Sequence, residues 1–194
     1  MRRLRHALGR VFQLLLAAVC GDRSVLPLAR FGTQYGGWWC SPGMLGPRQV
    51  ALCAGAGEDI SFDVALNANF GMRVLCVDPT PRAIAHVAGL LDAAATGSSY
   101  AVEGGAERGI DRLALLKLDI EGAEYAVLDE MLDGGVRPTQ VLVEFDELHL
   151  PLSPLAVLRV GRRVRRLRAA GYALVMTERT NFVFARRAPL VQPA

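Results

Sequence analysis

The chain has 194 residues, 52% of them hydrophobic, which is enough for one domain with a full core that needs no disulfide or metal to fold. Its net charge of +3 comes almost entirely from arginine, because Lys117 is the only lysine, and this small excess is weak evidence for a nucleic-acid partner. The four cysteines include no Cys-x-x-Cys pair, which argues against a zinc site or a disulfide framework and favours reduced thiols in a cytoplasmic protein.

Residues 1–20 are basic and have apolar side chains at helical spacing. The apolar residues that recur along one face are Leu4, Leu8, Val11, Phe12, Leu15 and Leu16. We expect an amphipathic helix that packs on the domain, with contact to a membrane surface as the alternative. The basic start before Cys20 also resembles a lipoprotein signal, but Val19 fills a position that requires a small residue. The apolar run is also too short to span a bilayer.

The stretch from Phe31 to Cys40 is rich in glycine and contains Tyr35, Trp38 and Trp39. We expect a loop here, because the glycines loosen the backbone. Its aromatic side chains either close over a ligand or pack against the core, and both interpretations stay open.

An apolar strand, a glycine turn and a helix follow one another after this loop. The strand is expected over Val50 to Ala54 and the helix over about Asp59 to Phe70, with Gly55 and Gly57 between them. Because these glycines lack a Cβ, the turn can adopt positive φ and a ligand can approach its backbone. The helix start directs unpaired N–H groups and a positive dipole end toward whatever lies over the turn.

A second apolar run, Met72 to Val77, ends in Asp78. In the nucleotide-binding half of a doubly wound sheet, an acid at this distance after a glycine turn accepts hydrogen bonds from ribose hydroxyls. The glycine turn and Asp78 together therefore predict a nucleoside site.

Three side chains after the second glycine indicate the kind of ligand. Ile60 stands at the sixth position of the Gly-x-Gly-x-x-Gly pattern, where its bulk hinders the close helix packing on which a dinucleotide pyrophosphate depends. Glu58 and Asp59 add negative charge where phosphates would lie. We therefore expect a ligand that is neutral or cationic at that end, as the sulfonium and amine of S-adenosylmethionine are.

A helix is expected from Pro81 to about Ala95, because Thr80 is a good N-cap and proline suits the first helical turn. Asp78 then lies at the carboxyl end of a strand beside a helix start, where open α/β sheets bind ligands. The following residues carry few signals, apart from a short strand suggested by residues 98–103.

Leu113 to Leu118 forms a further buried strand, followed by Asp119 and by a helix to about Leu132 that Gly134 and Gly135 end. Acids near a helix start stabilise its dipole by about 0.3 to 1 kcal/mol each. Asp119 has a stronger claim to function, because it ends a buried strand on the same edge of the sheet as the acid expected to hold the ribose.

The next strand is expected over Gln140 to Asp146, with Glu144 inside its apolar run. Burying an unpaired carboxylate is costly, so Glu144 is expected to be paired or functional. His149 follows in a loop and is a weaker candidate base.

The C-terminal part combines a basic helix with two strands. The helix, from Ser153 to about Ala170, carries six arginines that form either a solvated face or a patch for an anionic lipid or substrate. The strands, Tyr172 to Thr177 and Asn181 to Ala185, are joined by so short a turn that they must pair antiparallel.

These motifs together resemble the FkbM family of S-adenosylmethionine-dependent methyltransferases. The resemblance extends from about Phe31 to Phe184, and its most specific run is Lys-Leu-Asp-Ile-Glu-Gly-Ala-Glu at Lys117 to Glu124. The other matching runs are Tyr35 to Trp38, Gly55 to Phe62, Asp78 to Pro81, Gly171 with Tyr172, and Asn181 to Phe184.

The resemblance implies an α/β fold with a Rossmann-like class I methyltransferase sheet of seven strands, mostly parallel with an antiparallel C-terminal strand. It implies S-adenosyl-L-methionine as the cofactor and no metal. The residues expected to bind the cofactor are Gly55, Gly57, Glu58, Asp59, Ile60, Asp78, Pro79 and Thr80. The candidate catalytic residues are Asp119, Glu144 and His149.

Two departures from the family pattern affect this site. The region between the second and fourth strands, Leu90 to Asp111, is shortened, which would alter the adenine wall and open the acceptor pocket. Glu144 to Asp146 also stands where relatives often have histidines, which weakens the assignment of the base.

The resulting hypothesis is O-methylation of a hydroxyl group on a sugar or secondary metabolite by a cytoplasmic enzyme. We expect a methyltransferase domain over residues 31–187, an N-terminal extension over 1–30 and a tail over 188–194. The expected partner is a small-molecule acceptor and no nucleic acid, with peripheral membrane contact through the N-terminal helix as an open alternative. Two rival functions are a degenerate Rossmann-like module that binds a membrane or an anionic partner and, less favoured, a nicotinamide-dependent oxidoreductase.

Overall fold

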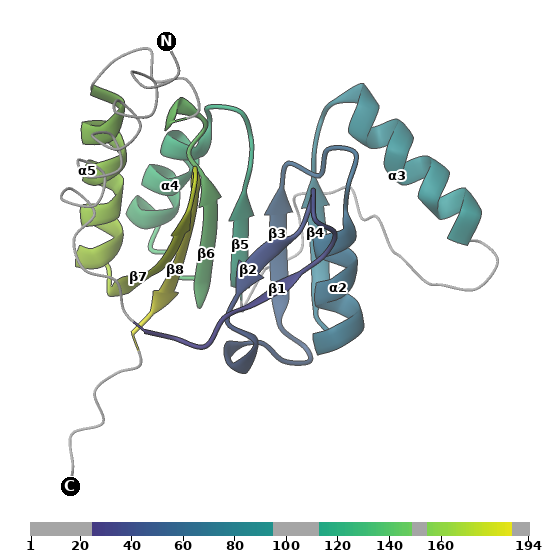
Figure 1. The fold of residues 1–194 in the computed structure, drawn as a ribbon, viewed down its shortest axis with the longest axis horizontal. Helices are drawn as coiled ribbons and strands as arrows, with labels where there is room; N and C mark the ends of the chain where they lie inside the picture. Colours follow the sequence, from purple (N-terminus) through teal and green to yellow (C-terminus); the bar gives the residue numbers. More distant parts are fainter. Residues whose placement is uncertain (1–24, 95–112, 149–154, 188–194) are drawn as a thin grey trace, which may run out of the picture.

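The computed structural model describes residues 25–94, 113–148 and 155–187. Within these ranges, six strands form one mixed sheet in the order β4-β3-β5-β6-β8-β7 (Figure 1). The strands are β3 (Val50–Ala54), β4 (Arg73–Val77), β5 (Leu113–Leu118), β6 (Gln140–Glu144), β7 (Tyr172–Glu178) and β8 (Asn181–Arg186). The first four are parallel, and β8 pairs antiparallel with both β6 and β7. The expected α/β sheet with an antiparallel C-terminal strand is confirmed.

Several expectations fall outside the described residues. These are the helix over residues 1–20, the short strand over 98–103 and His149. The seventh strand that the resemblance implies has no counterpart among the six strands of the described ranges.

The stretch expected to be a glycine-rich loop is instead a β-hairpin, so that expectation was wrong. Strand β1 (Ala29–Phe31) pairs antiparallel with β2 (Trp38–Cys40), and a short 3₁₀ helix, η1 (Pro42–Met44), follows. The glycines tighten the turn rather than loosen it: a Cβ on Gly37 would lie 2.4 Å from the carbonyl oxygen of Thr33. Trp38 is buried in the core, whereas Tyr35 at the turn is 89% exposed.

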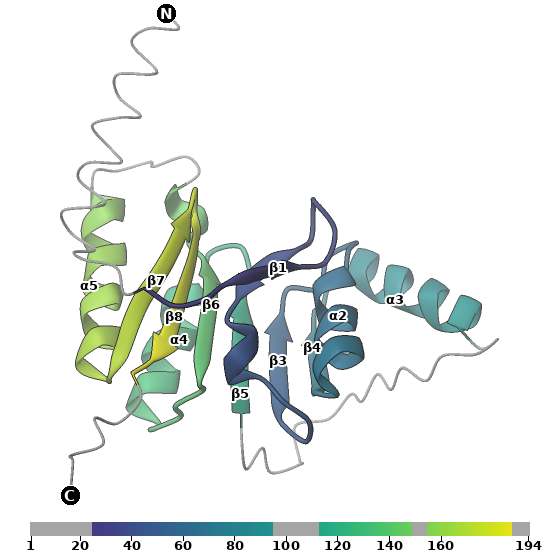
Figure 2. The same cartoon turned by 60° about the horizontal axis from the view of Figure 1, so that its bottom comes forward.

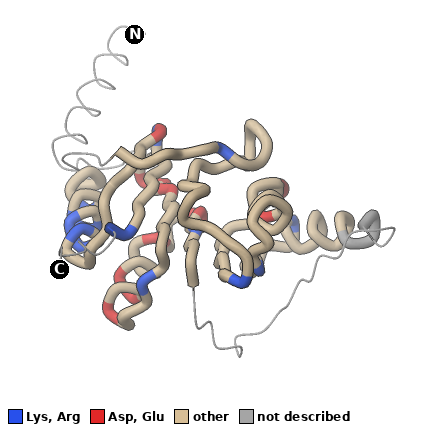
Figure 3. Tube along the Cα trace, turned by 90° about the horizontal axis from the view of Figure 1, so that it is seen from below, with Lys and Arg blue, Asp and Glu red and all other residues tan. Residues whose placement is uncertain are grey.

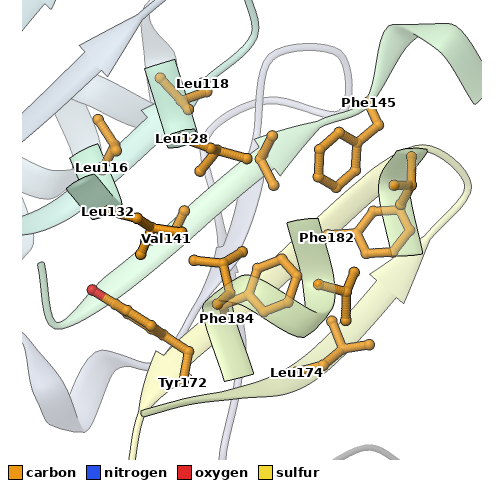
Figure 4. Close-up of a cluster of buried hydrophobic side chains, with 14 of the residues drawn as sticks. Leu116, Leu118, Leu128, Leu132, Val141, Phe145, Tyr172, Leu174, Phe182 and Phe184 are labelled. Atoms are coloured by element: carbon orange, nitrogen blue, oxygen red, sulfur yellow. The ribbon is translucent and has the colours of Figure 1, made fainter. Parts of the chain in front are cut away.

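The two faces of the sheet are covered by different elements. Helices α4 (Glu124–Asp133) and α5 (Leu155–Ala169) pack on one face, over a cluster that includes Leu116, Val141 and Phe184 (Figure 4). The hairpin and helix α2 (Ser61–Phe70) pack on the other face. Helix α3 (Pro81–Ala94) extends away from the sheet (Figures 1 and 2).

The strand order brings the chemically interesting residues to one edge. In parallel strands the carboxyl ends lie together, and the turns after β3, β4, β5 and β6 therefore form one rim of the sheet (Figure 1). Strand β6 ends at Glu144, slightly earlier than expected, because a 3₁₀ helix, η2 (Asp146–Leu148), begins two residues later.

Several of the arginines on α5 are paired with acids within the fold. Arg159 pairs with Glu147 of η2, and Arg163 and Arg166 pair with Asp129 of α4. Figure 3 shows where the basic and acidic residues lie along the chain, with basic positions gathered on α5. Among the described residues, no helix has the length and apolar character needed to cross a bilayer.

Candidate functional site

Gly55 forms the first corner of the site and joins three strands. Its N–H donates to the carbonyl oxygen of Val77 at 2.9 Å, and its φ is +86°. A Cβ at this position would lie 1.7 Å from the carbonyl oxygen of Asp119, and the N–H of Asp119 in turn donates to Ala54 at 3.1 Å. Glycine is therefore required here by the close approach of β3 and β5 as well as by the backbone conformation.

Gly57 connects the glycine turn directly to Asp78. Its N–H donates to Oδ2 of Asp78 at 2.9 Å, and its φ is +58°. A Cβ on Gly57 would meet nothing within 4 Å, so open space lies beside this residue. Sequence reasoning expected both groups at one nucleoside site, and the structure brings them together.

The second carboxylate oxygen of Asp78 accepts hydrogen bonds from Thr80, just before α3 begins. Oδ1 accepts from the N–H and the hydroxyl of Thr80 at 2.9 and 2.7 Å, and the Thr80 hydroxyl oxygen accepts the N–H of Ala83 at 3.4 Å. Partial burial alone would raise the pKa of Asp78, but the hydrogen bonds from Gly57 and Thr80 lower it below its ordinary value. Asp78 is therefore a preorganised, ionised acceptor, and Thr80 is confirmed as the N-cap.

Asp59 holds the β1–β2 turn against the start of α2. Its carboxylate accepts from the hydroxyl of Thr33 at 2.5 Å, from the N–H of Gly36 at 3.2 Å and from the N–H of Ser61 at 2.9 Å. The Ser61 hydroxyl oxygen also accepts the N–H of Thr33 at 2.8 Å. The chain's own turn thus lies over this helix start, where the sequence suggested ligand contact.

The neighbours of Asp59 have separate surroundings. Glu58 is exposed and pairs with Arg82 of α3. Ile60 is half-buried and precedes the first residue of α2.

Lys117 of β5 is buried under the glycine corner, with a side chain only 4% exposed. Its Nζ donates to the carbonyl oxygen of Gly55 at 2.6 Å and lies 3.7 Å from Oδ2 of Asp119. The ring centroid of Trp38 lies 5.5 Å from the same nitrogen. Sequence reasoning noted this lysine without giving it a role, because a contact with a residue 62 positions away leaves no local signal.

The loop after β5 is fixed by a buried acid. Glu124 is 1% exposed, and its carboxylate accepts the N–H groups of Ile120 at 3.1 Å and of Gly122 at 3.0 and 3.1 Å. Glu121 and Gly122 both have positive φ, which bends the chain between the strand and α4. The second glutamate of the Asp-Ile-Glu-Gly-Ala-Glu run therefore caps its own loop and leaves Asp119 at the rim.

Four carboxyl groups gather where β5 and β6 end: Asp119, Glu124, Glu144 and Asp146. Burial, together with the negative charges of Glu144 and Glu124, raises the pKa of Asp119 to about 6, against the opposing effect of Lys117. Burial and the charges of Glu124 and Glu144 also raise the pKa of Asp146 to about 6. Both groups are therefore able to exchange a proton near neutral pH.

The other two candidate bases stand differently. Oε1 of Glu144 accepts the hydroxyl of Thr180 at 2.8 Å, so Glu144 is paired as well as placed at the rim. His149 lies outside the described residues. Asp146 was not among the candidate site residues, although an acid that follows the carboxyl end of a parallel strand is expected near the same rim. Within the described part of the chain, no group of three or more His, Cys, Asp or Glu side chains is arranged to hold a metal ion.

Comparison with known families gives one match, over residues 102–174, to the model described as the methyltransferase FkbM domain. The matched segment includes β5, α4, β6 and the carboxyl groups at their ends, and it does not include the glycine turn or Asp78. No curated protein matched the chain.

Three solved structures with a similar arrangement are distant in sequence. The precorrin-6y C5,15-methyltransferase of Geobacter metallireducens is 15% identical, with 74% of this chain and 82% of that chain covered and a TM-score of 0.48. A Podospora anserina methyltransferase with bound SAH is 12% identical, with 72% of each chain covered and a TM-score of 0.47. A methyltransferase from Pyrococcus furiosus is 15% identical, with 74% and 77% covered and a TM-score of 0.44.

Proposed function

We propose that this chain, whose residues 102–174 match the model of the methyltransferase FkbM domain, uses S-adenosylmethionine to methylate a hydroxyl group of a small acceptor such as a sugar or a secondary metabolite. The observation that carries the proposal is the direct hydrogen bond between the Gly57 N–H and Asp78, beside open space and on the same rim as Asp119. Asp78, which can accept hydrogen bonds from a ribose, and Asp119, the candidate base, thus lie on the same rim of the sheet.

The residues at the glycine turn fit the adenosyl part of S-adenosylmethionine. Open space beside Gly57 admits a ligand close to the backbone. Asp78 is held in place by Gly57 and Thr80, and a carboxylate with about four acceptor positions can still accept from ribose hydroxyls. We assign Gly55, Gly57 and Asp78 to the inner part of this site.

The remaining cofactor assignments, Glu58, Asp59, Ile60, Pro79 and Thr80, are given supporting roles. Asp59 closes the hairpin turn over α2, and Thr80 fixes Asp78. Glu58 is exposed and pairs with Arg82, which links the glycine turn to the start of α3.

When bound, S-adenosylmethionine supplies a methyl group that its sulfonium already activates. The protein then has to align the acceptor oxygen with that methyl group and to exclude water. Asp119 is the first candidate to remove the hydroxyl proton, because a carboxyl group with a pKa of about 6 is mostly ionised at neutral pH and still accepts a proton readily. Glu144 is the second candidate, and His149 the third.

A thermal-shift comparison of S-adenosylmethionine with NAD tests the proposal against the oxidoreductase alternative. At a hundred times its dissociation constant, a ligand stabilises a protein by about 2.7 kcal/mol, or roughly 5–10 °C for a chain of this size. We expect S-adenosylmethionine to raise the melting temperature by this amount and NAD to leave it unchanged. A shift with NAD alone would refute the proposed function.

A further inference from the structure

Lys117 is an unusual residue for its surroundings. It is the only lysine of the chain, and it lies on the central strand β5, close to the carboxyl end of that strand, with 4% of its side chain exposed. A buried ammonium is costly unless it is paired. Its partners are the Gly55 carbonyl oxygen, the Asp119 carboxylate and the face of Trp38.

These partners come from the two halves of the proposed site. Gly55 belongs to the turn assigned to the cofactor, and Asp119 is the candidate base. Their backbones are already in contact, since the space for a Cβ on Gly55 is filled by the Asp119 carbonyl oxygen at 1.7 Å. Lys117 adds a second link between them, from the carbonyl oxygen of one to the carboxylate of the other.

The hairpin closes this arrangement from the other side. The Trp38 ring lies 5.5 Å from Nζ and is itself buried, so it covers the ammonium with an aromatic face. Ser41, which follows the hairpin, is tied to the sheet by two hydrogen bonds with the buried side chain of Gln140, at 2.7 and 3.0 Å. The side chain of Lys117 is therefore held in place by buried residues of the core.

We infer that Lys117 is a positioning residue for methyl transfer, whose buried ammonium holds the Gly55 carbonyl and the Asp119 carboxylate at a fixed spacing. This role rests on the proposed function, because the spacing between Gly55 and Asp119 affects methyl transfer only if Gly55 contacts the cofactor and Asp119 is the base. The Gly55 carbonyl is turned toward Lys117, which leaves the outer side of the turn to the cofactor. The Asp119 carboxylate keeps one positive neighbour among several acids.

The charged groups around Asp119 determine how its pKa would change if the Lys117 ammonium were removed. Asp119 is faced by Lys117 from its own strand, by Glu144 from β6, by Glu124 from α4 and by Asp146 from η2. Without the ammonium only negative neighbours would remain in this set, so Asp119 would retain its proton to higher pH.

The test uses Lys117→Met, which keeps the length and volume of the side chain and removes the charge. The Asp119 carboxyl signal is followed by NMR against pH in protein labelled with ¹³C-aspartate, and the affinity for S-adenosylhomocysteine is measured by calorimetry. We expect the titration midpoint to rise from about 6 by about 1 pH unit or more, and the affinity to fall about tenfold. Lys117→Arg should bring the midpoint back toward the wild-type value.

The control is Arg48→Met, which removes an exposed positive charge outside the site. It should change neither readout. A purely structural role for Lys117 would lower the melting temperature of Lys117→Met without moving the Asp119 midpoint. If the wild-type protein binds S-adenosylhomocysteine but Lys117→Met changes neither the Asp119 midpoint nor the affinity, the inference about Lys117 is overturned and the proposed function stands. Failure of the wild-type protein to bind this compound would instead overturn the proposed function and the role that rests on it.

Discussion

Gly55→Ala is expected to abolish cofactor binding and to destabilise the fold. The added Cβ would lie 1.7 Å from a backbone oxygen of Asp119, and the residue has a φ of +86°, which alanine adopts only with strain. Backbone strain and overpacking together predict a loss of about 2 to 5 kcal/mol in the free energy of unfolding. Because β3 and β5 would have to separate to make room for the alanine side chain, the glycine turn would also lose its position relative to Asp78.

Urea denaturation and calorimetry with S-adenosylhomocysteine measure the two effects. Gly135→Ala is the matched control, because Gly135 also has positive φ, a Cβ there meets nothing within 4 Å, and it follows α4 away from the rim. This control should lose only about 1 to 2 kcal/mol and keep full affinity. Wild-type stability and affinity in Gly55→Ala would show that the close approach of Gly55 to Asp119 does not shape the site.

Asp119→Asn is expected to lower the rate of methyl transfer by about 10² to 10⁴ while leaving the affinity for S-adenosylhomocysteine nearly unchanged. The amide has the shape of the carboxyl group but cannot take the acceptor proton. The raised pKa of Asp119 also gives the sign of the pH dependence. The base form exists above the pKa, so the wild-type rate should increase with pH and level off above about 6.

The assay follows transfer of a tritiated methyl group from S-adenosylmethionine to a panel of sugars and hydroxylated metabolites. Asp133→Asn serves as the control, because Asp133 is exposed on α4 and pairs with Arg166 on the outer surface. Full turnover in Asp119→Asn would eliminate Asp119 as the base and direct the same test to Glu144→Gln.

The four parallel strands of the main sheet were predictable because each is a short apolar run that ends at a glycine or an acid. The run Val50 to Ala54 and the run Leu113 to Leu118 match β3 and β5 at both ends. Thr80 and Pro81 likewise gave the start of α3 correctly, since capping depends on neighbouring residues.

Contacts between distant segments could not be derived in this way. The turn of the hairpin is held by Asp59, 26 residues after Thr33, and neither residue alone indicates the other. Lys117 and Gly55 are separated still further along the chain. Asp59 was interpreted through its local charge, whereas the fold uses its oxygens to satisfy N–H and O–H groups of the hairpin and of α2.

The arginines of α5 illustrate the same limit of local patterns. A helix with six arginines and no acid predicts either a solvated face or a patch for an anionic partner when its sequence is considered alone. In the fold, Arg159, Arg163 and Arg166 meet acids of η2 and α4. The pairing is tertiary, so only the packing of α4 against α5 reveals it.

Calorimetric titration of the wild-type protein with S-adenosylhomocysteine tests the central claim most directly, which is that the glycine turn and Asp78 together bind an adenosyl group. We predict saturable binding to the wild-type protein and about 10- to 100-fold weaker binding to Asp78→Asn, because a hydrogen bond to a charged group contributes about 1.5 to 3 kcal/mol. Folded wild-type protein that gives no binding heat, or an Asp78→Asn variant that binds as tightly as wild type, would contradict it.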